Sequence, residues 1–130
     1  MRTRISCDDG RRTTSRAFAL RLRPNQDFAG ALETFCRQRG IFRCRLHGGV
    51  GSTIGARFTN APSVVPFATE LTLRAGSIAP TATATLKAEL DVALVDYLGG
   101  LAEGTLVRGD NPVLMTMELV LEVLGEAARP

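Results

Sequence analysis

Apolar and polar residues alternate along several stretches of the chain, and this period of two predicts β-strands. The longest alternation is residues 86–95, where apolar side chains occupy every second position. Shorter strands are expected at residues 16–23, 41–47, 54–58, 69–75, 105–108 and 113–124. Because glycine, proline and serine are common in the segments between them, we expect about six to eight strands joined mainly by turns and loops.

One stretch has the period of a helix. From Phe28 the apolar residues recur at spacings of three and four up to Cys36, while Glu33 falls on the opposite side. Asp27 is placed to cap the helix N-terminus, and Gly40 to end the helix in a left-handed conformation. One main helix among strands joined by turns predicts an α+β fold with a curved, mainly antiparallel sheet.

The two ends of the chain lack these patterns. Residues 1–15 are polar and precede the first alternating stretch, so we expect a flexible N-terminal arm, and we expect residues 125–130 to be a tail that frays. Residues 16–124 would then be a single domain, as a chain length of 130 residues also suggests.

The stretch from Arg43 to Ser52 changes character halfway. Arg43, Arg45 and His47, the only histidine, alternate with apolar neighbours and should face away from the core. Glycines at positions 48, 49 and 51 follow, and we expect them to form a turn. Glycines there permit a positive φ, the close approach of another backbone, or the presentation of N–H groups to an anion. We favour packing roles for the glycines, with anion binding beside His47 as the alternative.

Charge divides the chain into two unlike halves. Residues 1–57 carry a formal charge of +8, residues 58–130 carry −5, and the whole chain carries +3. One interpretation is that strands of the two halves pair and their charges compensate. The other is an arginine-rich face for phosphates, which guanidinium groups bind in a bidentate manner.

Composition excludes several classes of protein. No apolar run reaches the roughly 18 residues of a membrane span, and the N-terminus lacks the apolar region of a signal peptide, so we expect a cytoplasmic protein. The three cysteines contain no Cys-x-x-Cys pair, which argues against a disulfide framework or a zinc ribbon. Cys36 and Cys44 fall on apolar faces and should be small core residues.

Four motifs in order resemble the PPC (plants and prokaryotes conserved) domain family. They are Ala-Phe-Ala-Leu-Arg-Leu-Arg-Pro at 17–24, Leu-His-Gly-Gly-Val-Gly-Ser at 46–52, Glu-Leu-Thr-Leu-Arg-Ala-Gly-Ser-Ile at 70–78 and Gly-Thr-Leu-Val-Arg-Gly-Asp-Asn at 104–111. The resemblance implies a bacterial member of a family without an established function there, related to plant AT-hook proteins. It also implies a homotrimer with a curved antiparallel sheet, a fold similar to that of acetolactate decarboxylases. The apolar residues of 86–95 and 113–124 independently suggest an oligomer, because one helix should not cover them all.

Two departures from the family pattern bear on function. The arginines before residue 16 lack the Arg-Gly-Arg-Pro core of an AT-hook, so minor-groove binding through a hook is not expected. Metal-binding relatives carry histidines where this chain has Glu89, Asp91 and Thr105, a set of donors that suits zinc poorly. We therefore expect no metal or other cofactor.

Two functions remain open. The first is a non-enzymatic homotrimer that acts as a binding or regulatory module, associated with DNA or with a regulatory protein. The alternative is a small-anion or metal-dependent small-molecule enzyme or receptor. Its cleft would be formed by Arg45, His47, Gly49, Gly51 and Ser52, together with Glu89, Asp91 and Thr105.

Overall fold

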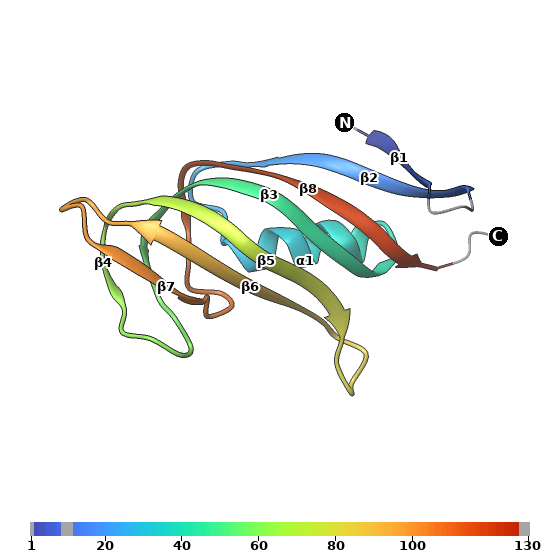
Figure 1. The fold of residues 1–130 in the computed structure, drawn as a ribbon. Helices are drawn as coiled ribbons and strands as arrows, with labels where there is room; N and C mark the ends of the chain where they lie inside the picture. The colour runs from blue at the N-terminus through green and yellow to red at the C-terminus, as the bar shows by residue number, and fades with distance from the viewer. Residues whose placement is uncertain (1, 9–11, 128–130) are drawn as a thin grey trace.

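The computed structural model describes residues 2–8 and 12–127, which form one helix and eight strands (Figure 1). In chain order these are β1 (Arg2–Asp8), β2 (Arg12–Leu22), α1 (Phe28–Gln38), β3 (Ile41–Ala56), β4 (Val64–Ala68), β5 (Glu70–Pro80), β6 (Leu86–Val95), β7 (Leu101–Thr105) and β8 (Val113–Glu126). The strands pair antiparallel in the order β1-β2-β8-β3-β5-β6-β7, and β4 pairs with β3 outside this order. This arrangement confirms the expected α+β fold.

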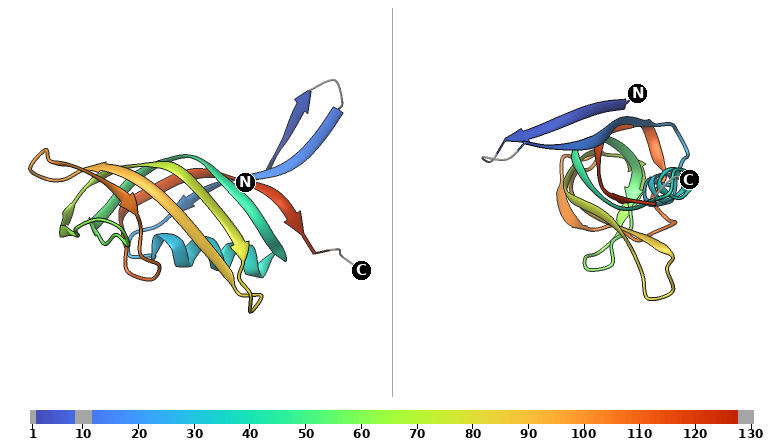
Figure 2. Two further views of the ribbon diagram at one scale, coloured as in Figure 1. Left: turned by 60° about the horizontal axis from the view of Figure 1, so that its bottom comes forward. Right: turned by 90° about the vertical axis from the view of Figure 1, so that its right-hand side faces the viewer.

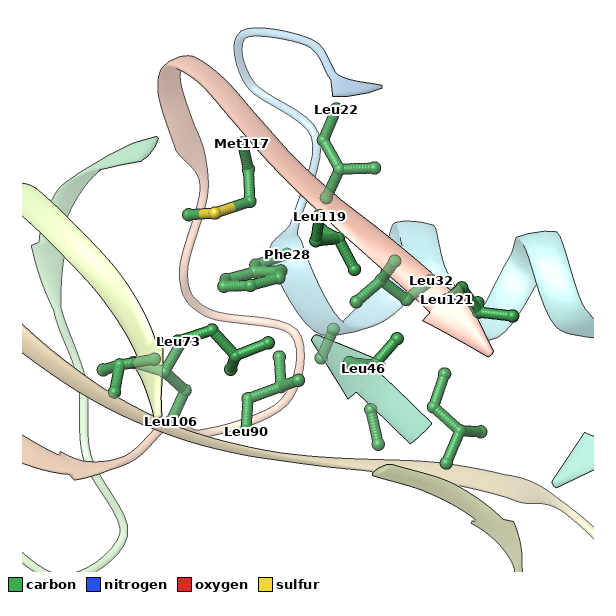
Figure 3. Close-up of a cluster of buried hydrophobic side chains, with 14 of the residues drawn as sticks. Leu22, Phe28, Leu32, Leu46, Leu73, Leu90, Leu106, Met117, Leu119 and Leu121 are labelled. Carbon is green, nitrogen blue, oxygen red and sulfur yellow. The ribbon is translucent and has the colours of Figure 1, made fainter. Parts of the chain in front are cut away.

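The sheet curves around α1, which lies on its concave side (Figures 1 and 2). Phe28 and Leu32 of the helix are fully buried against leucines and Met117 of the facing strands (Figure 3). Along β6 the apolar residues of the alternation are all buried, and the charged residues between them are exposed. The predicted strand periodicity is thereby confirmed, as is the burial of Cys36 and Cys44 in the core.

Polar groups at the start of the helix tie it to the turn before β8. The Asp27 carboxylate caps α1 by accepting from the Gly30 N–H at 2.7 Å, and it also accepts from the N–H groups of Gly109 and Asn111. The buried Asn111 side chain in turn bonds the backbone of Arg57 through both its oxygen and its nitrogen. The predicted cap is confirmed, and the motif at 104–111 has a structural role.

Glu33 does not face solvent as the helical period suggested, because it is only 8% exposed. Its Oε2 accepts from the Ala88 N–H at 2.8 Å and from Arg108 Nε at 2.6 Å, while its Oε1 accepts from Arg108 Nη2 at 3.0 Å. The hydrogen bond to Glu33 raises the pKa of Arg108 above its ordinary value. A carboxylate with donors from β6 and Arg108 is stable at this position, and it links the helix to the sheet.

Several element boundaries differ from those that the sequence suggested. The glycine stretch at 48–52 is part of β3 and forms no turn, because register shifts within the β3–β8 ladder accommodate its residues as bulges. β4 forms in a segment where no strand was expected, and β5 extends to Pro80. β7 spans Leu101–Thr105, so the strand expected at 105–108 is wrong except at Thr105, and β8 includes the first residues of the expected tail. Phe42 is exposed because register shifts on both sides of Arg43 interrupt the alternation.

The N-terminal residues also differ from expectation. Residues 2–8 form β1, and β2 begins at Arg12, so the segment has a regular structure that its polar sequence did not suggest. The two strands pair in register from Arg2 with Phe18 to Asp8 with Arg12. Whether this hairpin is flexible stays a prediction, as does the limit of the domain at residue 16.

Ion pairs join the basic first half of the chain to the acidic second half. Among the described residues, first-half arginines pair with second-half acids at Arg16 with Glu126, Arg21 with Glu118, Arg45 with Glu122 and Arg57 with Asp110, and Glu33 pairs with Arg108 in the reverse sense. The prediction that the two halves pair and compensate each other's charge is confirmed. In residues 2–8 and 12–127 there is no helix with both the length and the apolar character that crossing a membrane requires.

Candidate functional site

The outer face of the sheet, away from α1, carries a polar trough along β5. Ala75 and Ser77 form its floor, Arg45 and His47 of β3 stand on one side, and Glu89 and Asp91 of β6 on the other. A hollow of about 390 Å³ is lined by these six residues together with Arg74 and the neighbouring backbone. We refer to this feature as the trough.

The register of three strands produces this arrangement. Arg45 pairs with Ser77, and Ser77 pairs with Glu89, so these three side chains lie in one row across the sheet. One step along β5, Ala75 pairs with Asp91, which pairs with Thr105 of β7. A register shift between Leu73 and Ala75 leaves both Arg74 and Ala75 exposed on β5.

Glu122 of β8 orients the basic side of the trough. His47 Nε2 lies 2.8 Å from Glu122 Oε1, and Arg45 Nη1 lies 3.9 Å from the same oxygen. The Glu122 side chain is only 17% exposed, whereas those of Arg45 and His47 are largely accessible. One partly buried carboxylate therefore holds both basic groups from behind and leaves their other sides open.

The acidic side has a different arrangement. Thr105 Oγ1 donates a hydrogen bond to Asp91 Oδ1, and Arg74 pairs with Glu103 at the end of the trough. The Glu89 side chain is exposed and makes no hydrogen bond or ion pair with the described part of the chain. A second hollow of about 500 Å³ continues from the trough past Asp91 and Thr105 to Asn60.

The structure thus separates the residues that the sequence grouped into one cleft. Arg45, His47, Glu89 and Asp91 line the trough, and Thr105 lies beside it. Ser52 does not, because its Oγ accepts from the Met115 N–H at 3.1 Å, and Gly51 lines a different, mainly apolar hollow. Gly49 lies against Leu73.

Close packing accounts for Gly49 and Gly51. A Cβ at position 49 would lie 2.6 Å from Leu73 Cβ, and one at position 51 would collide with the Thr116 carbonyl oxygen and lie 2.7 Å from Met117 Cα. Gly48 has room around it but a φ of +62°, which favours glycine. Of the alternatives left open by the sequence, the close approach of another backbone applies to Gly51 and a positive φ to Gly48, whereas Gly49 is packed against the Leu73 side chain.

The family resemblance implied metal-binding histidines in relatives at the positions of Glu89, Asp91 and Thr105. Among residues 2–8 and 12–127, no group of three or more histidine, cysteine or acidic side chains is placed to hold a metal ion. Asp91 is already engaged by Thr105, and zinc prefers nitrogen and sulfur ligands. That zinc is not retained stays a prediction, to be tested by elemental analysis of protein purified without chelator.

Sequence reasoning missed four residues of this region: Arg74, Ala75, Ser77 and Glu122. Arg74 and Glu122 are polar residues within the stretches 69–75 and 113–124, for which strands were expected. The sequence did not predict how β3, β5, β6 and β8 pair, and this pairing brings these residues next to Arg45 and His47.

The fold and the family model define the class of protein. The sequence matches the Plants and Prokaryotes Conserved (PCC) domain, for which the abbreviation PPC is also used, over residues 10–125. The chain therefore belongs to this family. None of the curated proteins matches it significantly.

Solved structures share the fold. A hypothetical protein from Salmonella enterica is 25% identical, with a TM-score of 0.68 over 85% of this chain and 78% of its own. A PPC protein from Pyrococcus horikoshii is 19% identical, with a TM-score of 0.67 over 85% and 80% of the two chains. A Bacteroides thetaiotaomicron protein is 18% identical, with a TM-score of 0.67 over 97% of this chain and 86% of its own. Its name describes it as a putative DNA-binding protein.

Proposed function

We propose that this chain is a non-enzymatic binding module that assembles as a homotrimer. The observation that carries the proposal is a group of exposed apolar side chains at the β4 and β6–β7 end of the molecule, which we call the apolar patch. It comprises Val50, Phe67, Val95, Tyr97, Leu98 and Leu101. Leu98 is 78% exposed and Leu101 is 84% exposed, which is unusual for leucine in a monomer.

The members of the apolar patch are neighbours on the surface. The rings of Phe67 and Tyr97 have centroids 4.7 Å apart, and Val95 pairs with Leu101 across the β6–β7 hairpin. Val50, Val95 and Leu101 line a hollow of about 800 Å³. A second copy of the chain suits this surface because closed symmetric assemblies bury such patches, and the trimeric state is the one that the family resemblance implies.

The reason given in the sequence analysis for expecting an oligomer, exposed apolar residues of 86–95 and 113–124, holds only in part, because Val95, Met115 and Leu124 are exposed but most of the others are buried. Leu86, Leu90 and Leu94 of β6 are covered within the chain, because the sheet curves around α1 and its strands face one another across the core. The apolar patch shares only Val95 with those two stretches and otherwise lies mostly on the β6–β7 hairpin and β4. It is a further reason to propose self-assembly.

A variant pair tests the assembly. Leu101→Glu should yield a monomer or a much weaker trimer in sedimentation velocity, because a charge would have to be buried in the interface. Leu124→Glu, at a half-exposed leucine of β8 outside the apolar patch, is the matched control and should leave the trimer intact. A Leu101→Glu protein that sediments like the wild type would contradict the role of the patch.

DNA is the partner that we propose for the assembled module. Arg37, Arg39 and Arg43 are exposed around the end of α1 and the start of β3, and no acid pairs with them in the described residues. Arg39 stacks on the Phe35 ring at 4.1 Å, which holds this guanidinium at the surface. Arginines without acidic partners can bind phosphates, and the name of the Bacteroides structure supports this direction.

Salt dependence tests this part of the proposal. Fluorescence anisotropy with a labelled duplex should show an affinity that falls steeply as salt rises, because phosphate contacts release counterions. Arg39→Gln and Arg43→Gln should make the slope shallower, whereas Arg57→Gln, whose guanidinium is paired with Asp110, should change it less. Absence of binding at low salt would exclude DNA as the partner.

A second candidate function is a receptor for a small charged molecule at the trough. Its support is that basic and acidic side chains face each other across a hollow with an exposed floor. The thiols of Cys36 on α1 and Cys44 on β3 are buried in the core and do not line the trough with His47. For this second candidate we propose binding of a charged ligand, supported by the opposite charges that line the hollow.

A further inference from the structure

The trough separates its positive and negative groups. Arg45 and His47 stand on β3, Glu89 and Asp91 stand on β6, and β5 lies between these two strands (Figure 1). Neighbouring strands are about 4.8 Å apart, so the two sides start from backbones about 10 Å apart. The floor residues Ala75 and Ser77 are too short to bridge this distance, and the described ion pairs include none across the trough.

Each side of the trough has its own support. Glu122 lies behind Arg45 and His47 and fixes them without crossing the trough, while Thr105 orients the Asp91 carboxylate from β7. Glu89 keeps both carboxylate oxygens available to the solvent or to a ligand. Arg74 closes one end and is paired with Glu103.

We propose that the trough binds a small zwitterion whose anionic group and ammonium group are separated by a short aliphatic chain, as in an ω-amino acid. The anionic group lies against Arg45 and His47, the ammonium lies against Glu89 and Asp91, and the methylene groups lie over Ala75. This inference specifies the ligand class of the receptor function proposed above and rests on it. Every contributing side chain comes from one protomer, so the site does not require the trimer.

Charge and length together select this class. A dicarboxylate would place its second anion against Glu89 and Asp91, and a diamine would place one ammonium against Arg45. An α-amino acid carries its two charges on one carbon and cannot reach both sides of the trough at once. An ω-amino acid with several carbons between its charged groups can reach both sides of the trough. Its two charged groups then replace solvent at the basic side and at the acidic side, which do not contact each other in the protein.

Three probes of equal length test the proposal by isothermal titration calorimetry at one ionic strength. They are 5-aminopentanoate, 1,5-diaminopentane and pentanedioate. We expect 5-aminopentanoate to bind saturably, with the diamine and the dicarboxylate at least about ten-fold weaker, since each loses one charged contact and gains a repulsive one. Arg45→Gln and Glu89→Gln should each weaken 5-aminopentanoate by at least about ten-fold.

Glu118→Gln is the control, because Glu118 is exposed on β8, pairs with Arg21 and lies outside the trough. It should bind 5-aminopentanoate like the wild type, and circular dichroism should show that all variants are folded. Pentanedioate binding as tightly as 5-aminopentanoate would overturn the zwitterion and leave an anion receptor. Absence of binding by all three probes would overturn both the zwitterion and the receptor. Unchanged affinity in Glu89→Gln would also overturn the proposal, since it requires the acidic side.

Discussion

Glu33 of α1 and Glu89 of β6 carry two carboxylates near β6, on opposite faces of the sheet. Glu33 reaches β6 from the helix and accepts from the Ala88 N–H and from Arg108. Glu89, the next residue along β6, faces the trough and has no partner in the described chain. Glu33 and Arg108 are joined by direct hydrogen bonds, whereas in the trough Arg45 and His47 are kept apart from Glu89 and Asp91 by β5.

This difference separates groups that hold the fold from groups available for binding. A buried carboxylate is stable only when donors surround it, so removing a partner is costly. An exposed carboxylate is solvated, and its loss costs the fold little. We therefore expect changes on the core side to affect stability and changes in the trough to affect ligand affinity.

The largest effect is expected where strands approach too closely for any side chain. Gly51→Ala would drive a Cβ into the Thr116 carbonyl of β8, which cannot move without breaking the β3–β8 ladder. The loss of stability should exceed about 3 kcal/mol, enough to prevent folding of many domains. Gly48→Ala is the comparison, since that position has space and only its positive φ is strained, at about 1 kcal/mol. Urea unfolding at one protein concentration measures both, and equal losses would show that backbone approach is not the cause.

The second-largest effect on the free energy of unfolding is expected for Glu33, and the matched change at Glu89 should have little effect. Glu33→Ala leaves Arg108 and the Ala88 N–H without their acceptor and should cost about 2 kcal/mol, moderated by the partial exposure of Arg108. Glu89→Ala should change the free energy of unfolding by less than about 0.5 kcal/mol. Similar losses in the two variants would contradict the distinction between the faces.

The smallest effect is expected for His47. Its hydrogen bond with Glu122 is partly exposed, and Arg45 remains beside the same carboxylate, so His47→Ala should alter stability by less than about 0.5 kcal/mol. The same variant should weaken 5-aminopentanoate in calorimetry, because it removes part of the basic side. A large loss of stability would instead make His47 part of the fold.

Local patterns in the sequence predicted much of the fold for physical reasons. The alternation along β6 reflects a strand buried on one face, and Asp27 stands where a side-chain oxygen meets the free N–H groups of a helix. Arg45 and His47 were placed on the polar face correctly, since that assignment needs only the period of their own strand.

Features that depend on distant partners could not be predicted in this way. The glycines resemble a turn because no local signal distinguishes a turn from a bulged strand pressed against Met117 of β8. Glu33 occupies a polar position of the helical period, and only Arg108, 75 residues later, makes its burial favourable. Ser77 became a floor residue through its register with both Arg45 and Glu89.

The central claim, a module that assembles through the apolar patch, is tested most directly by the mass of the wild-type protein in solution. Size-exclusion chromatography with light scattering at micromolar concentration should give three times the chain mass of 13.9 kDa, without dissociation on moderate dilution. A mass of one chain across that concentration range would contradict the assembly, because no second copy of the chain would then cover the exposed leucines of the β6–β7 hairpin.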